Sequence, residues 1–438
     1  MDAAGSAAAN PSGTEELKGA RHRPKSLIGG TVGNVMEWYD FALYGYFAPV
    51  ISQQFFPSDN HLTSLIATFG VFAGGFAMRP LGGVVFGWIG DRFGRLAVLR
   101  LSIVTMGAAT LLLGLLPTES RVGVWAPILL VAVRLVQGLS VGGEFSGSVT
   151  YMVETSPLHR RGFAGSWANF GSLAGALAGP GLAALVTSVL ADDAVQTWGW
   201  RLPFLFGGAM GIAAYLYVRR LKHMPQTAHH ERQHQEDSPL HEAITQNLRE
   251  TLSAIVFASG YGICFYIPLV YLPTYAHEVV GLPSDIALQI NALGLALAMP
   301  FIPLAGWLSD HLLRRRTVLL IAFGAMAAAG WPLTALFAGG HLDLLWNQIA
   351  LALLIALPLG AAPAMFVELF PVADRLTGYS LAYNLGLGVA GGTAPMVATW
   401  LISASGYDPA PGVYFAVGAL VSVAGLLFMR DRSREPLR

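Results

Sequence analysis

The sequence predicts an all-α integral membrane protein with twelve transmembrane helices arranged as two six-helix repeats, and three observations lead to this prediction. Hydrophobic residues make up 54% of the chain and charged residues only 12%, whereas an ordinary soluble domain carries roughly a quarter charged residues. Twelve apolar stretches are each long enough to cross a bilayer, which takes about 20 residues. Two short polar motifs also occur twice.

The repeated motifs lie at corresponding positions of the two halves. GWIGDRFGR begins at Gly87, and a degraded copy, GWLSDHLLRRR, begins at Gly306. VETSPLHRR begins at Val153 and VELFPVADR at Val367, with Val, Glu, Pro and Arg at the same spacing in both. Two motifs repeated at nearly equal separation indicate two copies of one half.

The predicted spans follow one another with short connections, apart from one polar segment. They cover about residues 27–52, 62–90, 96–116, 125–153, 162–190, 200–221, 248–276, 284–311, 316–338, 343–370, 376–403 and 411–430. The polar segment is rich in histidine and charge, and we interpret it as a linker. The predicted organisation is a disordered N-terminus (1–26), an N-terminal bundle (27–221), the linker (222–247), a C-terminal bundle (248–430) and a tail (431–438).

Arginines indicate the orientation of these spans. They gather in every second gap and in both tails, as at Arg92, Arg160 and Arg219, whereas the opposite gaps hold Arg121, with Arg201 at the edge of a span. Because cytoplasmic loops collect basic residues, we predict that both termini are cytoplasmic and that the protein lies in the inner (plasma) membrane. The formal net charge of zero gives no indication of a nucleic-acid partner.

Two half-repeats of the same orientation are the arrangement of parallel-repeat transporters. GWIGDRFGR resembles the signature between the second and third helices of the major facilitator superfamily. Longer stretches resemble the metabolite:proton symporter family, which contains permeases for citrate, 2-oxoglutarate, shikimate, proline and betaine. They are TVGNVMEWYDFALYGY (31–46), FAMRPLGGVVFG (76–87), RLVQGLSVGGE (134–144), WGWRLPF (198–204) and YSLAYNLGLGVAGGTAP (379–395). The resemblance implies a monomer that transports a small metabolite together with protons.

Four ionisable residues are predicted at bilayer depth, where each costs roughly 2.5–3.5 kcal/mol on insertion scales and is a functional candidate for that reason. Glu37 and Asp40 lie about 15 and 20 Å into the first span at the helical rise. Arg134 lies about 14 Å into the fourth span and Arg79 about 18 Å into the second. Glu37 and Asp40 share one helical face.

These charges predict a proton site. In the superfamily that the chain resembles, helices 1, 4, 7 and 10 line the central cavity, which would place the carboxylates opposite Arg134. A carboxylate beside an arginine stays ionised until it loses that partner or its water. We therefore predict Asp40 as the proton carrier, with Glu37 next, and Arg134 as the partner that competes for a substrate carboxylate; a fixed structural salt bridge is the alternative. Glu144 could relay a proton inward or only hydrogen-bond to the first span.

Two arginines at mid-membrane predict a substrate with at least one carboxylate, because guanidinium binds carboxylates bidentately. A di- or tricarboxylate such as citrate or 2-oxoglutarate is the first expectation. The alternative is proline, glycine betaine or a shikimate-like acid, and GSWANFGSLAG (165–175) resembles the betaine/proline branch. The seventh span, with Pro268 and Pro273, is expected to break and to line the cavity. The predicted substrate-binding residues are Arg134, Arg79, Asn34, Tyr44, Gln137, Tyr266 and Asn384.

The repeated motifs also predict a cytoplasmic gate. Arg95 would pair with Glu154, and Asp91 would cap a helix of the other half, where a carboxylate contributes roughly 0.3–1 kcal/mol. The second half repeats the pattern with Asp310, Arg314, Glu368 and Arg375, although plain positive-inside topology is our preferred interpretation of the arginine run 314–316. The predicted gate residues are Asp91, Arg92, Arg95, Glu154, Arg161, Asp310, Glu368 and Arg375.

Two observations disfavour other function classes. No histidines cluster within the predicted spans, as a metal-dependent enzyme in the membrane would require, and the sequence has no GxxxxGK[ST] loop of an ATP-driven pump. We therefore expect no catalytic or metal-binding residues and no cofactor. A sensor that kept a transporter fold is an alternative of a different class. Osmosensing members of the resembled family carry a C-terminal coiled coil, and we do not expect osmotic activation through such a segment here.

Overall fold

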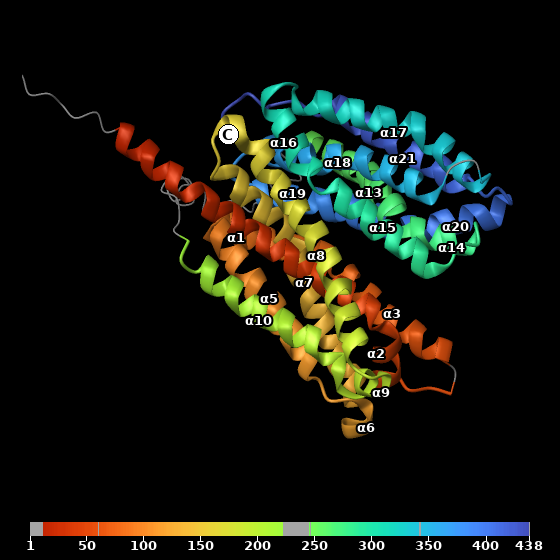
Figure 1. Cartoon of the computed structure of the whole chain (residues 1–438). Helices are drawn as coiled ribbons and strands as arrows, with labels where there is room; N and C mark the ends of the chain where they lie inside the picture. The colour runs from red at the N-terminus through yellow and green to blue at the C-terminus, as the bar shows by residue number, and fades with distance from the viewer. Residues whose placement is uncertain (1–11, 60, 222–244, 246, 341–342, 438) are drawn as a thin grey trace, which may run out of the picture.

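The computed structural model describes residues 12–59, 61–221, 245, 247–340 and 343–437. Regular structure within these residues is helical, without any β-strand. In Figure 1 the helices form two bundles, one from α1 to α10 and one from α13 to α21. The predicted linker 222–247 lies outside the described residues apart from positions 245 and 247, as do residues 1–11 of the N-terminus.

The first bundle contains eight longer helices and two short ones between spans. The longer helices are α1 (Ser12–Tyr46), α2 (Ala48–Phe55), α3 (His61–Ala77), α4 (Arg79–Phe93), α5 (Arg95–Leu115), α7 (Trp125–Glu154), α8 (Arg161–Val189) and α10 (Arg201–Val218). The short helices are α6 (Glu119–Val122) and α9 (Asp192–Ala194).

The second bundle repeats this organisation. Its helices are α13 (Leu248–Tyr266), α14 (Leu272–Glu278), α15 (Ser284–Ala298), α16 (Phe301–His311), α17 (Arg315–Ala338), α18 (Leu344–Leu369), α19 (Arg375–Tyr383), α20 (Ala394–Ser405) and α21 (Ala410–Phe428). Two π-helical segments interrupt it: Ile267–Tyr271 joins α13 to α14, and Asn384–Gly391 follows α19.

Eleven helical stretches of the described chain are long and apolar enough to cross a membrane. They correspond to the second to twelfth predicted spans. The first predicted span, 27–52, is covered by α1 and α2, which are not among the eleven. The first span, and with it the total of twelve, therefore stays a prediction, as does the cytoplasmic location of both termini.

The first helix differs from its predicted course at both ends. It begins at Ser12, so residues 12–26, which we expected to be disordered, are helical. Their glutamate, leucine, lysine and alanine residues favour helix. We had expected disorder because the segment is polar. At the other end the helix breaks at Phe47, and α2 starts with a proline in its first turn, the position where proline is tolerated.

Proline also interrupts the helices that carry the candidate site. The second predicted span is divided at Met78, and α4 begins with Arg79 and a proline directly after it. The seventh predicted span breaks as expected, at the π-helical segment that contains Pro268. Proline lacks the N–H that continues the helical hydrogen bonding. Both breaks lie beside residues that line the cavity described below.

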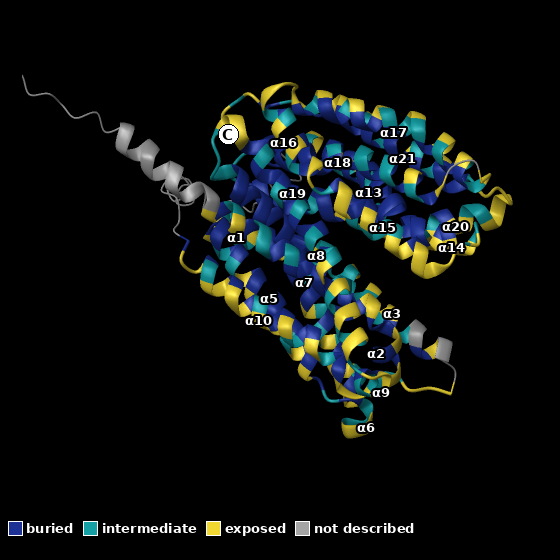
Figure 2. Cartoon of the chain, viewed as in Figure 1, coloured by how far each residue is buried: buried dark blue, intermediate teal, exposed yellow. Residues whose placement is uncertain are grey.

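The two bundles meet along α4 and α8 of the first and α16, α18 and α19 of the second. In Figure 1 they lie close together at the end that carries the C-terminus, and they diverge toward α9 on one side and α14 on the other. Figure 2 shows buried residues concentrated where the bundles face each other, with exposed residues on the outer faces. Many exposed side chains are large and apolar, such as Trp400 at 63% exposure, as expected of a surface that faces lipid.

Candidate functional site

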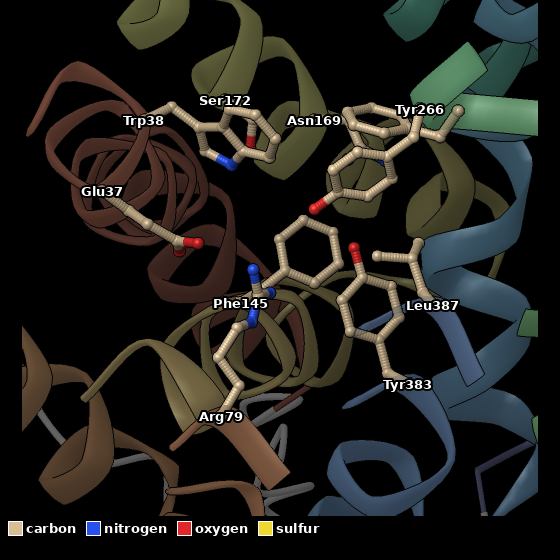
Figure 3. Close-up of a pocket in the computed structure, with 10 residues that line it drawn as sticks. Glu37, Trp38, Arg79, Phe145, Asn169, Ser172, Tyr266, Tyr383 and Leu387 are labelled. Atoms are coloured by element: carbon tan, nitrogen blue, oxygen red, sulfur yellow. The ribbon is translucent and has the colours of Figure 1, made fainter. Parts of the chain in front are cut away.

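A small, mostly enclosed cavity lies between the two bundles at the level of the helix breaks (Figure 3). Helices α1, α4, α7 and α8 contribute to its wall from the first bundle, and α13, α19 and the π-helical segment after α19 contribute from the second. Its lining residues are Glu37, Trp38, Arg79, Phe145, Asn169, Ser172, Phe265, Tyr266, Tyr383 and Leu387.

Aromatic rings from both bundles form much of this wall. Trp38 meets Phe265 edge to face, with ring centroids 5.7 Å apart, and Phe145 stacks on Tyr383 at 4.7 Å. Each pair joins one bundle to the other. Figure 3 shows the hydroxyl groups of Tyr266 and Tyr383 pointing into the cavity. The cavity is therefore bordered by π faces with a few hydrogen-bonding groups.

One acidic and one basic side chain face each other across the cavity. Glu37 comes from α1 and Arg79 from the first turn of α4, and both are buried. Figure 3 shows the Arg79 guanidinium directed toward the space in front of Glu37. Within the described residues they form no ion pair with each other, and Glu37 Oε2 and Arg79 Nε have no hydrogen-bond partner. Unsatisfied charged groups that line a cavity are suited to bind a ligand of complementary charge.

A second polar cluster lies one helical turn along α1. Asp40 is fully buried and forms an ion pair with Arg134, with 2.5 Å between its Oδ2 and the guanidinium Nη1. Thr110 and Gln137 donate hydrogen bonds to the other carboxylate oxygen, at 3.0 and 3.1 Å. The guanidinium lies over the ring of Tyr44, 3.8 Å from its centroid.

This cluster divides the residues that we expected to act together. The predicted contact between Asp40 and Arg134 is present, and Tyr44 and Gln137 join it. None of these four side chains lines the cavity, whereas Glu37, which we expected opposite Arg134, does. The expectation that two arginines face one substrate is wrong for this structure, because Arg134 does not line the cavity and its Nη1 pairs with Asp40 and Gln137; its Nε and Nη2 have no hydrogen-bond partner among the described residues. Glu37 and Asp40 are three residues apart, and this spacing alone places them on one face of α1. In the structure their side chains nevertheless reach two different sites.

Three further predicted residues lie between helices and away from the cavity. Asn34 donates hydrogen bonds to Ser148 and to its own helix, and Asn384 donates to the Gly142 carbonyl at 2.6 Å. Glu144 is fully buried against the backbone of Gly33, and neither carboxylate oxygen has a hydrogen-bond partner among the described residues. The hydrogen bond from Glu144 to the first span, one of our two alternatives, is therefore not formed.

Some of the residues that we predicted to form a gate contact one another where α4 meets α19. Asp91 accepts hydrogen bonds from the backbone N–H groups of Leu376 and Thr377, at 3.2 and 2.9 Å, and pairs with Arg95 at 2.7 Å. The carboxylate thus caps the N-terminus of a helix in the other bundle, as predicted.

Glu154 connects the same two bundles. It lies 2.6 Å from Arg375 and 3.5 Å from Arg95, so its shorter ion pair crosses between the bundles. The prediction named only the pair with Arg95. We call Asp91, Arg95, Glu154 and Arg375 the first latch.

A second latch repeats this arrangement between α16 and α8. Asp310 accepts hydrogen bonds from the backbone N–H groups of Gly162 and Phe163, both at 2.8 Å. Arg315 binds Asp310 at 2.8 Å and Glu368 at 2.7 Å. We call Asp310, Arg315, Glu368 and Arg161 the second latch; Arg161 lies 3.8 Å from Glu368.

Three details of the predicted gate are wrong. Arg375, which we grouped with the residues of the second half, pairs with Glu154 of the first half. Arg315, which we assigned to simple topology, is the buried partner in the second latch, whereas Arg314 is exposed. Arg92 is also exposed and lies over the Trp88 ring, 5.3 Å from its centroid. In a run of neighbouring arginines, helix phase decides which one faces the interior, and a boundary error of one residue changes that choice.

Sequence reasoning missed most of the cavity wall. Trp38, Phe145, Phe265 and Tyr383 were not selected, because an aromatic residue in a membrane helix is ordinarily a packing residue. One signal was available for Tyr383: it directly precedes Asn384, which we chose for its polarity.

Comparison with known proteins places the chain in a family. The sequence profile of the Major Facilitator Superfamily matches residues 31–362. A proline/betaine transporter of Salmonella typhimurium is 32% identical over 94% of this chain and 85% of its own length. A glycine betaine/proline/ectoine/pipecolic acid transporter of Dickeya dadantii is 33% identical over 94% of this chain and 84% of its own length.

Solved structures show the same fold. The proton:xylose symporter XylE bound to 6-bromo-6-deoxy-D-glucose has a TM-score of 0.80 at 17% identity, covering 95% of this chain and 98% of that one. The transporter FucP in the outward conformation has a TM-score of 0.67 at 16% identity, covering 93% and 100%. With its apolar helices and its two bundles, the chain therefore belongs to the major facilitator superfamily and is a multi-pass transporter of the inner (plasma) membrane.

Proposed function

We propose that this transporter is a proton-coupled symporter that imports a small zwitterion with one carboxylate and one quaternary or secondary ammonium group, such as glycine betaine or proline. This was the alternative in the sequence analysis. The observation that carries it is the composition of the cavity: five aromatic rings, one arginine and one carboxylate. The names of the similar proline/betaine transporters support the same choice.

The charge of the cavity favours a zwitterion over citrate or 2-oxoglutarate. Among the described residues that line it, Arg79 is the single cation and Glu37 the single anion. A di- or tricarboxylate would bring two or three negative charges into a buried space with one guanidinium, and uncompensated buried charge is costly. A zwitterion brings one charge of each sign, which the two side chains balance.

Each part of such a substrate has a partner in this site. Arg79 would bind the carboxylate through its planar guanidinium, with the hydroxyls of Tyr266 and Tyr383 as additional donors. The ammonium group would lie against the aromatic faces, Trp38 among them, because a ring attracts a cation within about 6 Å of its centroid. Glu37 adds negative charge on that side.

The proton is proposed to bind at Asp40. In its charged form this carboxylate holds Arg134, Gln137 and Thr110 in one network. A proton on Asp40 removes the charge that Arg134 needs, so the network has to rearrange. Because α1 carries both Asp40 and Glu37, a rearrangement at one is transmitted to the cavity within one helical turn. Glu144 stays a proposed proton relay toward the cytoplasm.

A transport assay in sealed liposomes tests this function. Purified protein is reconstituted around a pH-sensitive dye, and glycine betaine, proline, citrate, 2-oxoglutarate and shikimate are added in turn. We expect acidification of the lumen with glycine betaine or proline and none with citrate. Trp38→Leu should weaken apparent affinity for glycine betaine about tenfold, since a desolvated cation–π contact contributes up to about 2 kcal/mol.

The matched control is Trp400→Leu, which removes a tryptophan from the exposed outer face and should leave affinity unchanged. Acidification by citrate or 2-oxoglutarate, without a response to either zwitterion, would overturn the substrate assignment. Substrate uptake without acidification would instead overturn the proton coupling.

A further inference from the structure

A second cavity lies outside the transport pathway, where the starts of α13 and α17 approach the end of α21. Four arginines line it, Arg249, Arg316, Arg430 and Arg432, together with a single carboxylate, Glu250. It lies at the same end of the molecule as the latches, because Arg316 directly follows Arg315 of the second latch. On the predicted orientation this is the cytoplasmic side of the membrane.

Three separate elements bring these arginines together. Arg249 lies in the first turn of α13, Arg316 in the first turn of α17, and Arg430 just after α21. The Arg316 guanidinium donates a hydrogen bond to the Leu427 carbonyl at 3.0 Å, which fixes the start of α17 against the end of α21. The arginines therefore converge through the packing of the fold.

Asp431 fixes the chain that follows α21. It accepts hydrogen bonds from the backbone N–H groups of Arg316 and Ser433, both at 2.9 Å. Burial alone would raise the pKa of Asp431, but these hydrogen bonds and the charge of Arg315 outweigh it and hold that pKa below its ordinary value. An ionised Asp431 thus keeps the neighbouring arginines in place at neutral pH.

The cavity carries an excess of positive charge. In the described part of the chain, neither Arg249 nor Arg316 forms an ion pair, and Arg430 lies 3.9 Å from Glu435 in an exposed contact. Glu250 is the one acidic side chain in the lining. Guanidinium groups bind phosphate oxygens through paired, charge-assisted hydrogen bonds. The cavity is therefore chemically suited to a phosphate-bearing anion.

The rim of the cavity is apolar and faces outward. Leu427 and Phe428 belong to its lining and are 57% and 65% exposed. Leu248 and Leu252, on the neighbouring surface of α13, are 47% and 52% exposed. A phosphate group in the cavity would thus lie beside a surface on which hydrocarbon chains can pack. This combination matches a phospholipid better than a soluble phosphate.

We propose that this cavity binds the phosphate head group of an anionic phospholipid from the cytoplasmic leaflet, with its acyl chains along α21 and α13. Basic pockets between transmembrane helices on the cytoplasmic side are suited to such head groups. The site uses none of the residues that line the transport cavity, so it does not depend on the substrate proposed above.

Lipid binding to the full chain tests this site. Protein in a mild non-ionic detergent is exposed to phosphatidylglycerol, to phosphatidylcholine or to inorganic phosphate, and bound molecules are counted by native mass spectrometry. We expect preferential retention of phosphatidylglycerol. The double variant Arg249→Gln/Arg430→Gln should weaken that retention roughly thirtyfold, since two charges near a membrane surface are removed. Phe428→Gln should weaken retention of the lipid without affecting phosphate.

The matched control is Arg92→Gln/Arg314→Gln, which removes two exposed arginines outside the cavity and should retain the lipid as the unmodified protein does. Equal retention of phosphatidylglycerol and phosphatidylcholine would overturn the proposal. So would an equal loss in the control variant, which would indicate attraction to surface charge in general. Binding of inorganic phosphate as tight as that of the lipid, unaffected by Phe428→Gln, would overturn the lipid assignment in favour of a soluble anion.

Discussion

Asp40 and Glu37 lie one turn apart on α1 and have very different surroundings. Asp40 is satisfied by an ion pair and two hydrogen bonds and does not reach the cavity. Glu37 reaches the cavity and has an oxygen without a partner. A group that a substrate cannot touch can change protonation without losing the substrate, whereas a group in the cavity wall affects binding directly. These surroundings are consistent with the different roles proposed for the two carboxylates.

Asp40→Asn separates these roles by experiment. The amide cannot carry a proton, so we expect proton-driven accumulation of substrate to be lost while counterflow exchange across the same vesicles persists in part. Uptake with and without a proton gradient, and exchange at equal pH, provide the measurement. Glu37→Gln is the matched comparison. Because Glu37 lines the cavity, this variant should raise the KM of exchange. Equal loss of accumulation and exchange in Asp40→Asn would contradict a carrier role for this residue.

The charged residues of the candidate site could be predicted from the sequence, but the aromatic residues that line its cavity could not. A buried charge in a membrane helix is rare and costly, so Glu37, Asp40, Arg79 and Arg134 stood out by their type alone. Trp38 has no such signal, because its place in a cavity wall depends on the rotation of α1. Which of the charged residues face the cavity and which face the Asp40 cluster also depends on the rotation of α1 about its axis. Residue spacing predicts that rotation only to within about one residue.

At the scale of elements, glycine positions Arg79. Gly142 of α7 lies directly against the backbone of α4, and a methyl group added there would collide with the carbonyl of Arg79 and with the backbone of Gly82 and Gly83. Small residues at such contacts let membrane helices approach closely. The close approach of α7 therefore holds the first turn of α4, and with it the guanidinium, at the cavity.

Gly142→Ala should therefore impair transport through displacement of Arg79. We expect a raised KM for substrate in the protein that folds, because the methyl group would collide with a backbone carbonyl and α4 has to move away from α7. The measurement is initial-rate uptake in liposomes with equal protein content. Gly324→Ala is the matched control, since no atom lies within 4 Å of a methyl group added at that glycine. An unchanged KM in Gly142→Ala would contradict this account of the helix contact.

Elements as a whole were predicted better than their interruptions. Eleven apolar stretches were found where the sequence placed them, because hydrocarbon thickness fixes their length. The break at Pro268 was expected from proline chemistry. The break at Met78 was not, although Pro80 follows it closely, since proline is tolerated both inside a kinked helix and in the first turn of a new one. Which of the two occurs depends on packing against other helices.

At the scale of the whole molecule, two equivalent latches hold the bundles together at one end. In each, an aspartate whose side chain has no exposed surface caps the first turn of a helix in the opposite bundle, and an arginine bridges it to a glutamate. The latches are related by the repeat that is visible in the sequence. An opening motion at this end has to break both latches. The free energy that favours the closed arrangement therefore includes the contributions of both.

Asp91→Asn and Asp310→Asn should each favour opening at this end, and together they should favour it additively. The cost of losing one carboxylate cap is about 1–2 kcal/mol in a partly buried geometry, which corresponds to a fivefold to thirtyfold shift in the equilibrium between closed and open forms.

Spin labels at His159→Cys and His311→Cys report the separation, since these exposed side chains lie on opposite bundles with ring centroids 6.4 Å apart. The native Cys264 is buried and does not compete for the label. Arg92→Gln, outside both latches, should leave the distance distribution unchanged. If the double variant kept the short distance of the unmodified protein, the closure would have to come from the apolar contacts between the bundles, and the latches would be ion pairs without a gating role.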